Sequence, residues 1–300
     1  MKGFLNAVIF LLLFCIPSSA QTNFWDSPNA YFGLKKPGEK PEVFAKGLLA
    51  DSGIVLGRVG FSSDGKEFYY TYARHWFDSR GSGTKQKIFN GKQWKKPTVL
   101  FKDLANPALS SDGKKMFLGG NSSEVWEAHR TNDGWSKPVV VHNKIYGLYN
   151  FQPVNSGVYY AGSNANAGSK KDYSTYDFCK FSILNGDTLV ESLGTPLNTN
   201  GFDGDLFVAP DESFMIISAN ETPAYECELF ISFRKPDLTW TNPQSLGADI
   251  NSGAAHRFGQ YVTPDKKYLV YTKGTSEKDC NFYWLRFDKL LTKLRQKAFQ

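Results

Sequence analysis

The chain has 300 residues, a formal net charge of +6, 41% hydrophobic residues and 21% charged residues. This balance is ordinary for a globular protein and excludes a disordered or fibrous chain. The lysines are scattered, partly as pairs, so the positive charge indicates solvated loops and argues against a nucleic-acid-binding stripe. The aromatic content of 15% is high. Packed β-sheets explain it, and a carbohydrate-binding surface is the alternative.

The first 20 residues have the pattern of a secretory signal peptide. Lys2 is followed by an apolar run at residues 8–16 and by small residues up to Ala20. The run is too short to span a bilayer, and cleavage is expected between Ala20 and Gln21. We therefore predict a periplasmic or secreted protein. No later stretch is apolar enough to cross a membrane.

One hairpin pattern recurs along the mature chain, at residues 60–70, 108–118, 207–216 and 261–270. Each copy has a short apolar strand, a turn in which Asp follows Ser or Pro, and an aromatic-rich strand. Asp favours such turns because its side chain bonds the backbone two residues on. A degenerate fifth copy at residues 150–160 lacks the Asp-Gly turn. Recurrence of one all-β unit predicts a propeller or a solenoid.

A third strand and a closing strand follow most of these hairpins. The closing strands begin with Pro, at residues 97–101, 138–141 and 243–246. Four strands per unit are typical of a propeller blade. The last unit has no closing strand, whereas residues 41–45 repeat the closing pattern near the N-terminus. A basic amphipathic helix is expected at residues 288–297.

These patterns predict an all-β fold with five four-stranded blades, in which the N-terminal strand completes the last blade. The propeller occupies one domain at residues 21–300. Closing the ring removes the exposed sheet edges that an open array would leave. The alternative is six blades, if residues 22–56 contain another.

Several segments resemble a known family. Residues 209–214, 229–235, 240–243 and 246–251, with residues 31–34, 41–45 and 282–285, resemble the WD40-like (PD40) β-propeller proteins. These are related to the TolB propeller and are common in secreted proteins of Bacteroidetes-type bacteria. The resemblance covers nearly the whole mature chain and implies the propeller fold. TolB itself implies a protein-binding role at the cell envelope, although the separate N-terminal domain of TolB has no counterpart here.

Candidate ligand-binding residues lie where the inner strands begin, because propellers bind ligands at the mouth of the central channel. Alignment of the units places Arg58, Asn106, Asn150 and Asp205 at this position, and Asp203, His256 and Arg257 one or two residues upstream of it. Such a ring could hold a sugar, a peptide carboxylate or another polar ligand. The alternative is that these residues only line a water-filled channel.

The same residues argue against catalysis. Of the four histidines only His256 lies at an inner-strand entrance, so a lyase site built from several histidines is not expected. Asp203 and Asp205 come from one blade, whereas glycosidases need carboxylates that face each other. We predict no catalytic residue, no metal and no cofactor.

Three cysteines remain after Cys15 is removed with the signal peptide. When the repeat units are aligned, Cys179, Cys227 and Cys280 fall at the same position, the start of the third strand of three successive blades. Adjacent blades fan apart away from the axis, which places these positions too far apart for a disulfide. We expect small residues suited to a buried strand start, with a disulfide or soft-metal cluster as the alternative.

The sequence therefore favours an extracytoplasmic binding module whose partner is a protein, a peptide or an envelope polysaccharide. Two alternatives stay open: a carbohydrate-active lyase or hydrolase, and a structural component of an envelope assembly. Nucleic acid is not expected as a partner.

Overall fold

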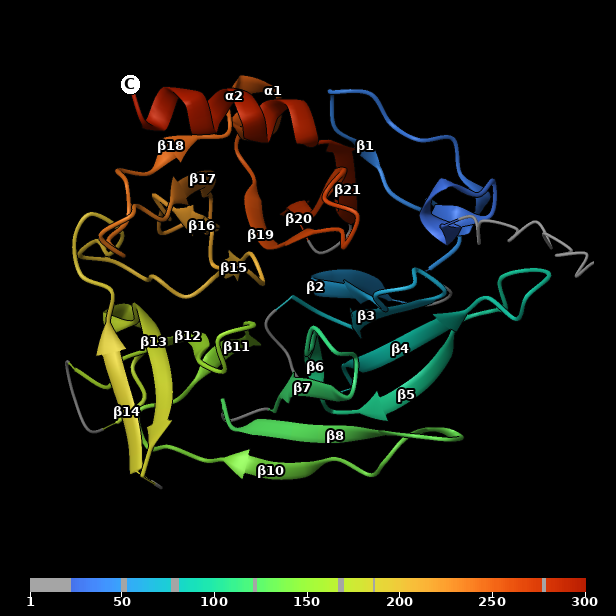
Figure 1. Cartoon of the computed structure of the whole chain (residues 1–300), viewed down its shortest axis with the longest axis horizontal. Helices are drawn as coiled ribbons and strands as arrows, with labels where there is room; N and C mark the ends of the chain where they lie inside the picture. Colours follow the sequence, from blue (N-terminus) through green and yellow to red (C-terminus); the bar gives the residue numbers. More distant parts are fainter. Residues whose placement is uncertain are drawn as a thin grey trace, which may run out of the picture.

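The structure is a computed structural model that describes residues 23–49, 53–76, 81–120, 123–166, 170–185, 187–276 and 279–300. The predicted signal peptide lies outside these residues. Five four-stranded antiparallel sheets follow one another around a ring, which makes the protein a five-bladed β-propeller (Figure 1). In the described residues no helix is long and apolar enough to cross a membrane.

Each blade has its first strand innermost, and in blades 1 to 4 the strands follow in chain order. The strands of blades 1 and 2 are β2 (Ile54–Phe61), β3 (Glu67–Ala73), β4 (Gly83–Ile88) and β5 (Thr98–Lys102), then β6 (Ala105–Leu109), β7 (Lys115–Gly119), β8 (Val125–Thr131) and β10 (Val139–His142), with β9 (Gly134–Trp135) paired to β8. Those of blades 3 and 4 are β11 (Tyr149–Pro153), β12 (Tyr159–Ser163), β13 (Asp177–Leu184) and β14 (Asp187–Ser192), then β15 (Leu206–Val208), β16 (Phe214–Ala219), β17 (Glu228–Phe233) and β18 (Gln244–Ser245).

Blade 5 joins the two ends of the chain. It contains β19 (His256–Val262), β20 (Tyr268–Ser276), β21 (Asp279–Arg286) and, as its fourth strand, β1 (Glu42–Val43). Glu42 lies opposite Trp284 and Val43 opposite Tyr283. The backbone N–H of Phe44 continues the ladder to the carbonyl of Phe282 at 2.8 Å. The predicted closure by the N-terminal strand is confirmed, and the alternative of six blades is wrong.

The segment ahead of β1 packs into the junction between blades 1 and 5. It forms two short 3₁₀ helices, η1 (Phe24–Asp26) and η2 (Ala30–Gly33). Tyr31 is fully buried, and its ring lies 5.0 Å from that of Tyr268 and 5.7 Å from that of Phe61. Because blade 5 supplies one neighbour and blade 1 the other, the aromatic contacts hold the seam of the ring together.

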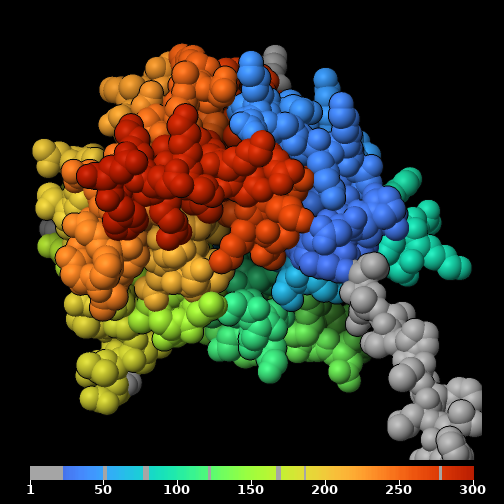
Figure 2. Space-filling view, turned by 45° about the horizontal axis from the view of Figure 1, so that its top comes forward, coloured from blue at the N-terminus to red at the C-terminus, as the bar shows by residue number. Residues whose placement is uncertain are grey.

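The C-terminal residues form the predicted helix, α2 (Asp288–Ala298). Leu294 is buried, and Leu290 and Leu291 pack against the same apolar cluster between blades 4 and 5. Figure 2 shows this red segment lying over the orange strands, beside the blue N-terminal segment. Two further short helices are η3 (Tyr173–Thr175) and α1 (Ala248–Asn251).

The recurrent turn has the expected chemistry. Asp64 accepts hydrogen bonds from the Ser62 hydroxyl at 2.7 Å and from the backbone N–H of Lys66 at 3.1 Å. Asp112 and Asp265 make the equivalent bonds in blades 2 and 5. Each Asp thus fixes its turn through its own side chain, as the sequence predicts.

Candidate ligand-binding site at the channel mouth

A cavity of about 620 Å³ opens where the inner strands begin, and all five blades contribute to it. We call it the wide-mouth cavity. Its lining residues are Leu56, Thr71, Ala73, Trp76, Ser82, Ala105, Asn106, Gly119, Gly120, Ser123, Leu148, Tyr149, Asn150, Tyr173, Ser174, Phe202, Asp205, Glu221, Tyr225 and His256. The set contains five aromatic rings besides the imidazole, together with two carboxyl groups and two amides. It contains no Lys and no Arg from the described part of the chain.

A bulge in the inner strand turns some of these side chains toward the channel. The pairing of the inner strand with the second strand shifts register after Leu56 in blade 1, Ala105 in blade 2, Tyr149 in blade 3 and Phe258 in blade 5. One residue in each bulge has a left-handed backbone: Gly57, Asn106, Asn150 and Gly259. Such bulges re-aim side chains, and Asn and Gly tolerate the left-handed conformation best.

Below the cavity, the Arg58 side chain forms hydrogen bonds to two other blades. Its guanidinium donates to the carbonyls of Asn150 and Phe151, both at 3.1 Å, and of Leu206 at 2.9 Å. Only 3% of the residue is exposed, and burial lowers its pKa to about 10. The side chain therefore links blade 1 to blades 3 and 4. It lines a second cavity of about 300 Å³, at the hairpin-turn end of the channel.

Asp205 and Asn150 form the polar floor of the wide-mouth cavity. The Asn150 amide donates a hydrogen bond to the Asp205 carboxyl, and the charge of Arg58 acts on the same group. Burial outweighs both interactions and raises the pKa of Asp205 to about 6. Asn106 faces the same space and accepts the backbone N–H of Arg58 through Oδ1 at 3.1 Å.

The remaining predicted residues lie elsewhere. Asp203 is fully buried and accepts the backbone N–H of Thr199 at 2.6 Å. Arg257 is 1% exposed and donates to backbone carbonyls. Neither lines either of the two channel cavities. Of the seven predicted residues, Asn106, Asn150, Asp205 and His256 thus meet in the wide-mouth cavity, and Arg58 lines the second one.

The aromatic residues that line the cavity and Glu221 were not predicted from the sequence. Trp76 and Tyr173 follow the second strands of blades 1 and 3, and Glu221 and Tyr225 follow that of blade 4. These loops open at the same end as the starts of the inner strands. Aromatic residues in the loops after the second strands of blades 1, 3 and 4 were therefore the available signal. Tyr173 and Tyr225 are 45% and 47% exposed, so part of each ring surface is accessible at the mouth.

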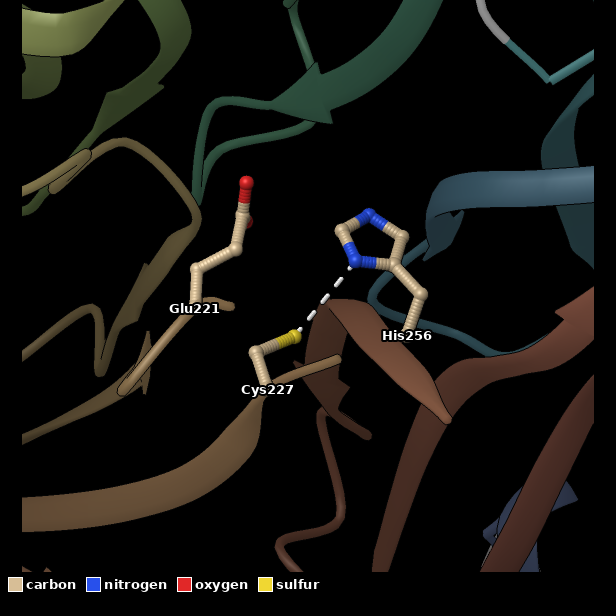
Figure 3. A group of neighbouring side chains, drawn as sticks. All are labelled: Glu221, Cys227 and His256. Carbon is tan, nitrogen blue, oxygen red and sulfur yellow. Dashed lines mark hydrogen bonds between the residues drawn. The ribbon is translucent and has the colours of Figure 1, made fainter. Parts of the chain in front are cut away.

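One corner of the cavity holds a Glu, a Cys and a His. Figure 3 shows Glu221, Cys227 and His256 side by side, from the loop after β16, the residue before β17 and the start of β19. One ligand atom of each lies within 4.8 Å of the others. Burial lowers the pKa of His256 to about 4 and raises that of Glu221 to about 7. The imidazole is therefore neutral at pH 7.

The three cysteines among the described residues, Cys179, Cys227 and Cys280, are buried free thiols. The Cys179 thiol is 3.8 Å from the carbonyl of Ser163, and the Cys280 thiol is 3.6 Å from that of Val55. Cys227 alone has a histidine beside it, with Sγ 3.5 Å from Nδ1 of His256. The three residues thus share a place in the blade but not a chemical environment.

The fold and the mouth define a five-bladed β-propeller with an aromatic cavity rich in hydrogen-bond acceptors. No protein-family model matches the sequence, and no curated protein matches it. Among solved structures, the fold is similar to TolB from Acinetobacter baumannii, with a TM-score of 0.48 and 13% identity over 79% of this chain and 55% of TolB.

Two further structures are similar. The periplasmic gluconolactonase PpgL of Pseudomonas aeruginosa has a TM-score of 0.43 and 12% identity over 73% of this chain and 65% of its own. The β-propeller domain of Swd1 from Myceliophteria thermophila has a TM-score of 0.42 and 8% identity over 75% of this chain and 64% of its own. The chain thus spans about half of TolB and just under two thirds of the other two. The similarity concerns the propeller fold.

Proposed function

We propose that the protein is an extracytoplasmic binding module and that the wide-mouth cavity takes a neutral sugar unit of a glycan. The observation that carries this proposal is the lining: five aromatic rings stand around carboxyl and amide groups, without a Lys or Arg among the described lining residues. Sugar hydroxyls donate hydrogen bonds to such acceptors, and the apolar faces of a sugar ring pack against aromatic faces.

The size of the cavity supports the same ligand class. A volume of about 620 Å³ lies in the range that small-molecule sites occupy, and it accommodates one or two sugar rings. An anionic ligand is disfavoured, because Arg58, the buried cation that the described residues place near the floor, already donates to three backbone carbonyls. The signal-peptide pattern of residues 1–20 supports export, where a glycan of the envelope or the surroundings is accessible.

The test is a glycan array with the mature protein, followed by calorimetric titration of the sugars that bind. Tyr225→Ala and Tyr173→Ala should each weaken binding by about tenfold, since one ring face contributes on the order of 1–2 kcal/mol. Phe299→Ala is the matched control, because Phe299 is 51% exposed but lies on the C-terminal segment outside the cavity. Binding that all three variants retain, or binding of basic peptides without any glycan, would overturn the proposal.

The same titrations separate binding from catalysis. A binding module leaves the captured glycan intact after prolonged incubation, as the chromatographic profile of the sugar shows. Cleavage of the glycan that disappears in Asp205→Asn would instead favour a carbohydrate-active enzyme.

A further inference from the structure

The Glu221, Cys227 and His256 group has the composition of a transition-metal site. It offers one carboxylate oxygen, one sulfur and one imidazole nitrogen, all within 4.8 Å of one another. In a tetrahedral zinc site the bond lengths of about 2.0–2.3 Å place two ligand atoms ~3.5 Å apart. Side-chain movements of about an ångström would therefore bring the sulfur, a carboxylate oxygen and the nearer imidazole nitrogen onto one ion.

A backbone carbonyl holds the His256 ring, which turns Nδ1 toward the cysteine, 3.5 Å from Cys227 Sγ (Figure 3). The same Nδ1 lies 2.6 Å from the carbonyl oxygen of Tyr225. A carbonyl only accepts, so Nδ1 donates this hydrogen bond and the lone pair is on Nε2, which points away from Cys227 in Figure 3. Binding an ion through Nε2 keeps this bond and needs a larger movement of the ring, whereas binding through Nδ1 breaks it. A backbone carbonyl that fixes the ring in this way is the usual outer partner of a metal-binding histidine.

The backbone around the sulfur is also fixed. Sγ of Cys227 accepts the backbone N–H of Arg257 at 3.1 Å and lies 3.1 Å from the Arg257 carbonyl oxygen. The Cys227 backbone N–H donates to the carbonyl of Ala255 at 3.0 Å. The guanidinium of Arg257 donates to the carbonyls of both Cys227, at 2.8 Å, and Ala255, at 3.2 Å. Arg257 is therefore a positioning residue that holds the cysteine and the residue before His256.

The group borders the wide-mouth cavity on one side. Glu221 and His256 line the wide-mouth cavity, whereas Cys227 lies behind them with 3% of its surface exposed. An ion held by all three would face the cavity on its fourth side. Three protein ligands and one open position are typical of zinc sites that bind a water or a substrate.

We propose that Glu221, Cys227 and His256 form a three-ligand site for Zn²⁺ whose fourth position opens into the wide-mouth cavity. Binding forms bonds from zinc to the thiolate sulfur, an imidazole nitrogen and a carboxylate oxygen, and the thiol proton passes to solvent. No oxidant or reductant is needed, because zinc keeps its charge. The site requires no sugar in the cavity, so it stands or falls independently of glycan binding.

Cobalt substitution tests the site directly. Mature protein is treated with a chelator, freed of it, and titrated with Co²⁺ under reducing conditions. The expected result is a thiolate-to-cobalt charge-transfer band in the near ultraviolet that saturates at one equivalent and disappears when one equivalent of Zn²⁺ is added. A wild-type protein that develops no such band would overturn the proposal.

Variants assign the ligands. Cys227→Ala should abolish the band, and Glu221→Gln, at a partly exposed loop position, should retain it while weakening cobalt binding at least tenfold, as expected when a ligand is lost. Cys179→Ser/Cys280→Ser is the matched control and should keep wild-type binding, because both thiols lie outside the group. A band that survives in Cys227→Ala, or vanishes in the double control, would contradict the assignment.

Thermal unfolding gives a second readout that does not depend on colour. Zn²⁺ at a hundredfold excess over its Kd should stabilise the wild-type protein by about 2.7 kcal/mol and raise its unfolding midpoint. Glu221→Gln should show a clearly smaller rise. An equal rise in both proteins would place the bound zinc elsewhere.

Discussion

At the scale of single residues, the cavity depends on buried charges that the backbone holds in place. Arg58 donates to three carbonyls from two other blades, and Arg257 donates to carbonyls around Cys227 and His256. The sequence indicated both as residues of the mouth but did not show which atoms they reach. An arginine at this position can point into the channel toward a ligand or extend across it to the backbone of other blades, and only the closed ring shows which of the two it does.

Arg58 should contribute more to stability than any exposed arginine. In Arg58→Met three buried carbonyls lose a donor and Asp205 loses its nearby positive charge, so the free energy of unfolding should fall by about 3–5 kcal/mol. The free energy of unfolding of Arg58→Lys should lie between those of the wild type and Arg58→Met, because lysine keeps the charge but not the several N–H donors of the guanidinium. Urea denaturation is the measurement, with the exposed Arg74→Met as control. A loss below about 1 kcal/mol in Arg58→Met would refute the cross-ring role.

Asp203 should make the protein less stable as the pH rises. Burial raises its pKa from 3.8 to about 6, with a smaller effect from the charge of Asp177. The native state then holds the proton more tightly than the unfolded chain does. Its contribution is most favourable below about pH 3.8 and is lost as the pH rises through about 6, a difference of about 3 kcal/mol.

Asp203→Asn removes this titration. Stability measured by denaturant unfolding between about pH 4 and pH 6.5 should then decline less steeply with pH than in the wild type. Asp205 and Glu221, whose pKa values are also raised, should leave a residual decline. If the stability of the wild type and of the variant declines equally with pH, Asp203 has the same pKa in the native and the unfolded state.

At the scale of elements, the recurrent turn holds one residue in the left-handed conformation. Gly113 has φ +67° in blade 2, and Lys266 has φ +59° at the equivalent position of blade 5. A residue with a Cβ is strained there, whereas glycine is not. Lys266→Gly should therefore raise the free energy of unfolding by about 0.5–1 kcal/mol, even though the exposed ion pair with Asp211 is lost.

The reverse substitution in blade 2 is the control. A Cβ on Gly113 would have no atom within 4 Å, so the cost of Gly113→Ala is that of the backbone alone, about 1 kcal/mol of destabilisation. Thermal or urea unfolding compares the two variants. Equal effects of the same sign would mean that the turn does not impose a left-handed residue.

Elements were predictable where local chemistry repeats. The Asp turns, the closing strands and helix α2 follow from short sequence patterns, and the structure confirms them. Strand β14 was not assigned from the sequence, because Asp187–Ser192 lacks the leading Pro of the other closing strands. Glu221 was missed for a related reason: it lies in a loop without a repeated pattern, and its neighbours come from another blade.

At the scale of the whole molecule, the cavity exists because the ring is closed. Its walls come from all five blades, and the Glu221, Cys227 and His256 group lies across the junction of blades 4 and 5. The sequence placed Cys227 at a position that three blades fill with cysteine and His256 at an inner strand. The contact between the two residues could not be predicted from the sequence, since they are 29 residues apart and their contact depends on how adjacent blades pack in the ring.

A designed disulfide tests ring closure most directly. Val43 and Tyr283 are directly opposed across β1 and β21, so Val43→Cys/Tyr283→Cys should form a disulfide on mild oxidation, which peptide mapping by mass spectrometry would detect. Val43→Cys/Arg286→Cys, shifted by three residues along β21, should not. If the shifted pair cross-links, or if neither pair does, the N-terminal strand does not close blade 5 in this register.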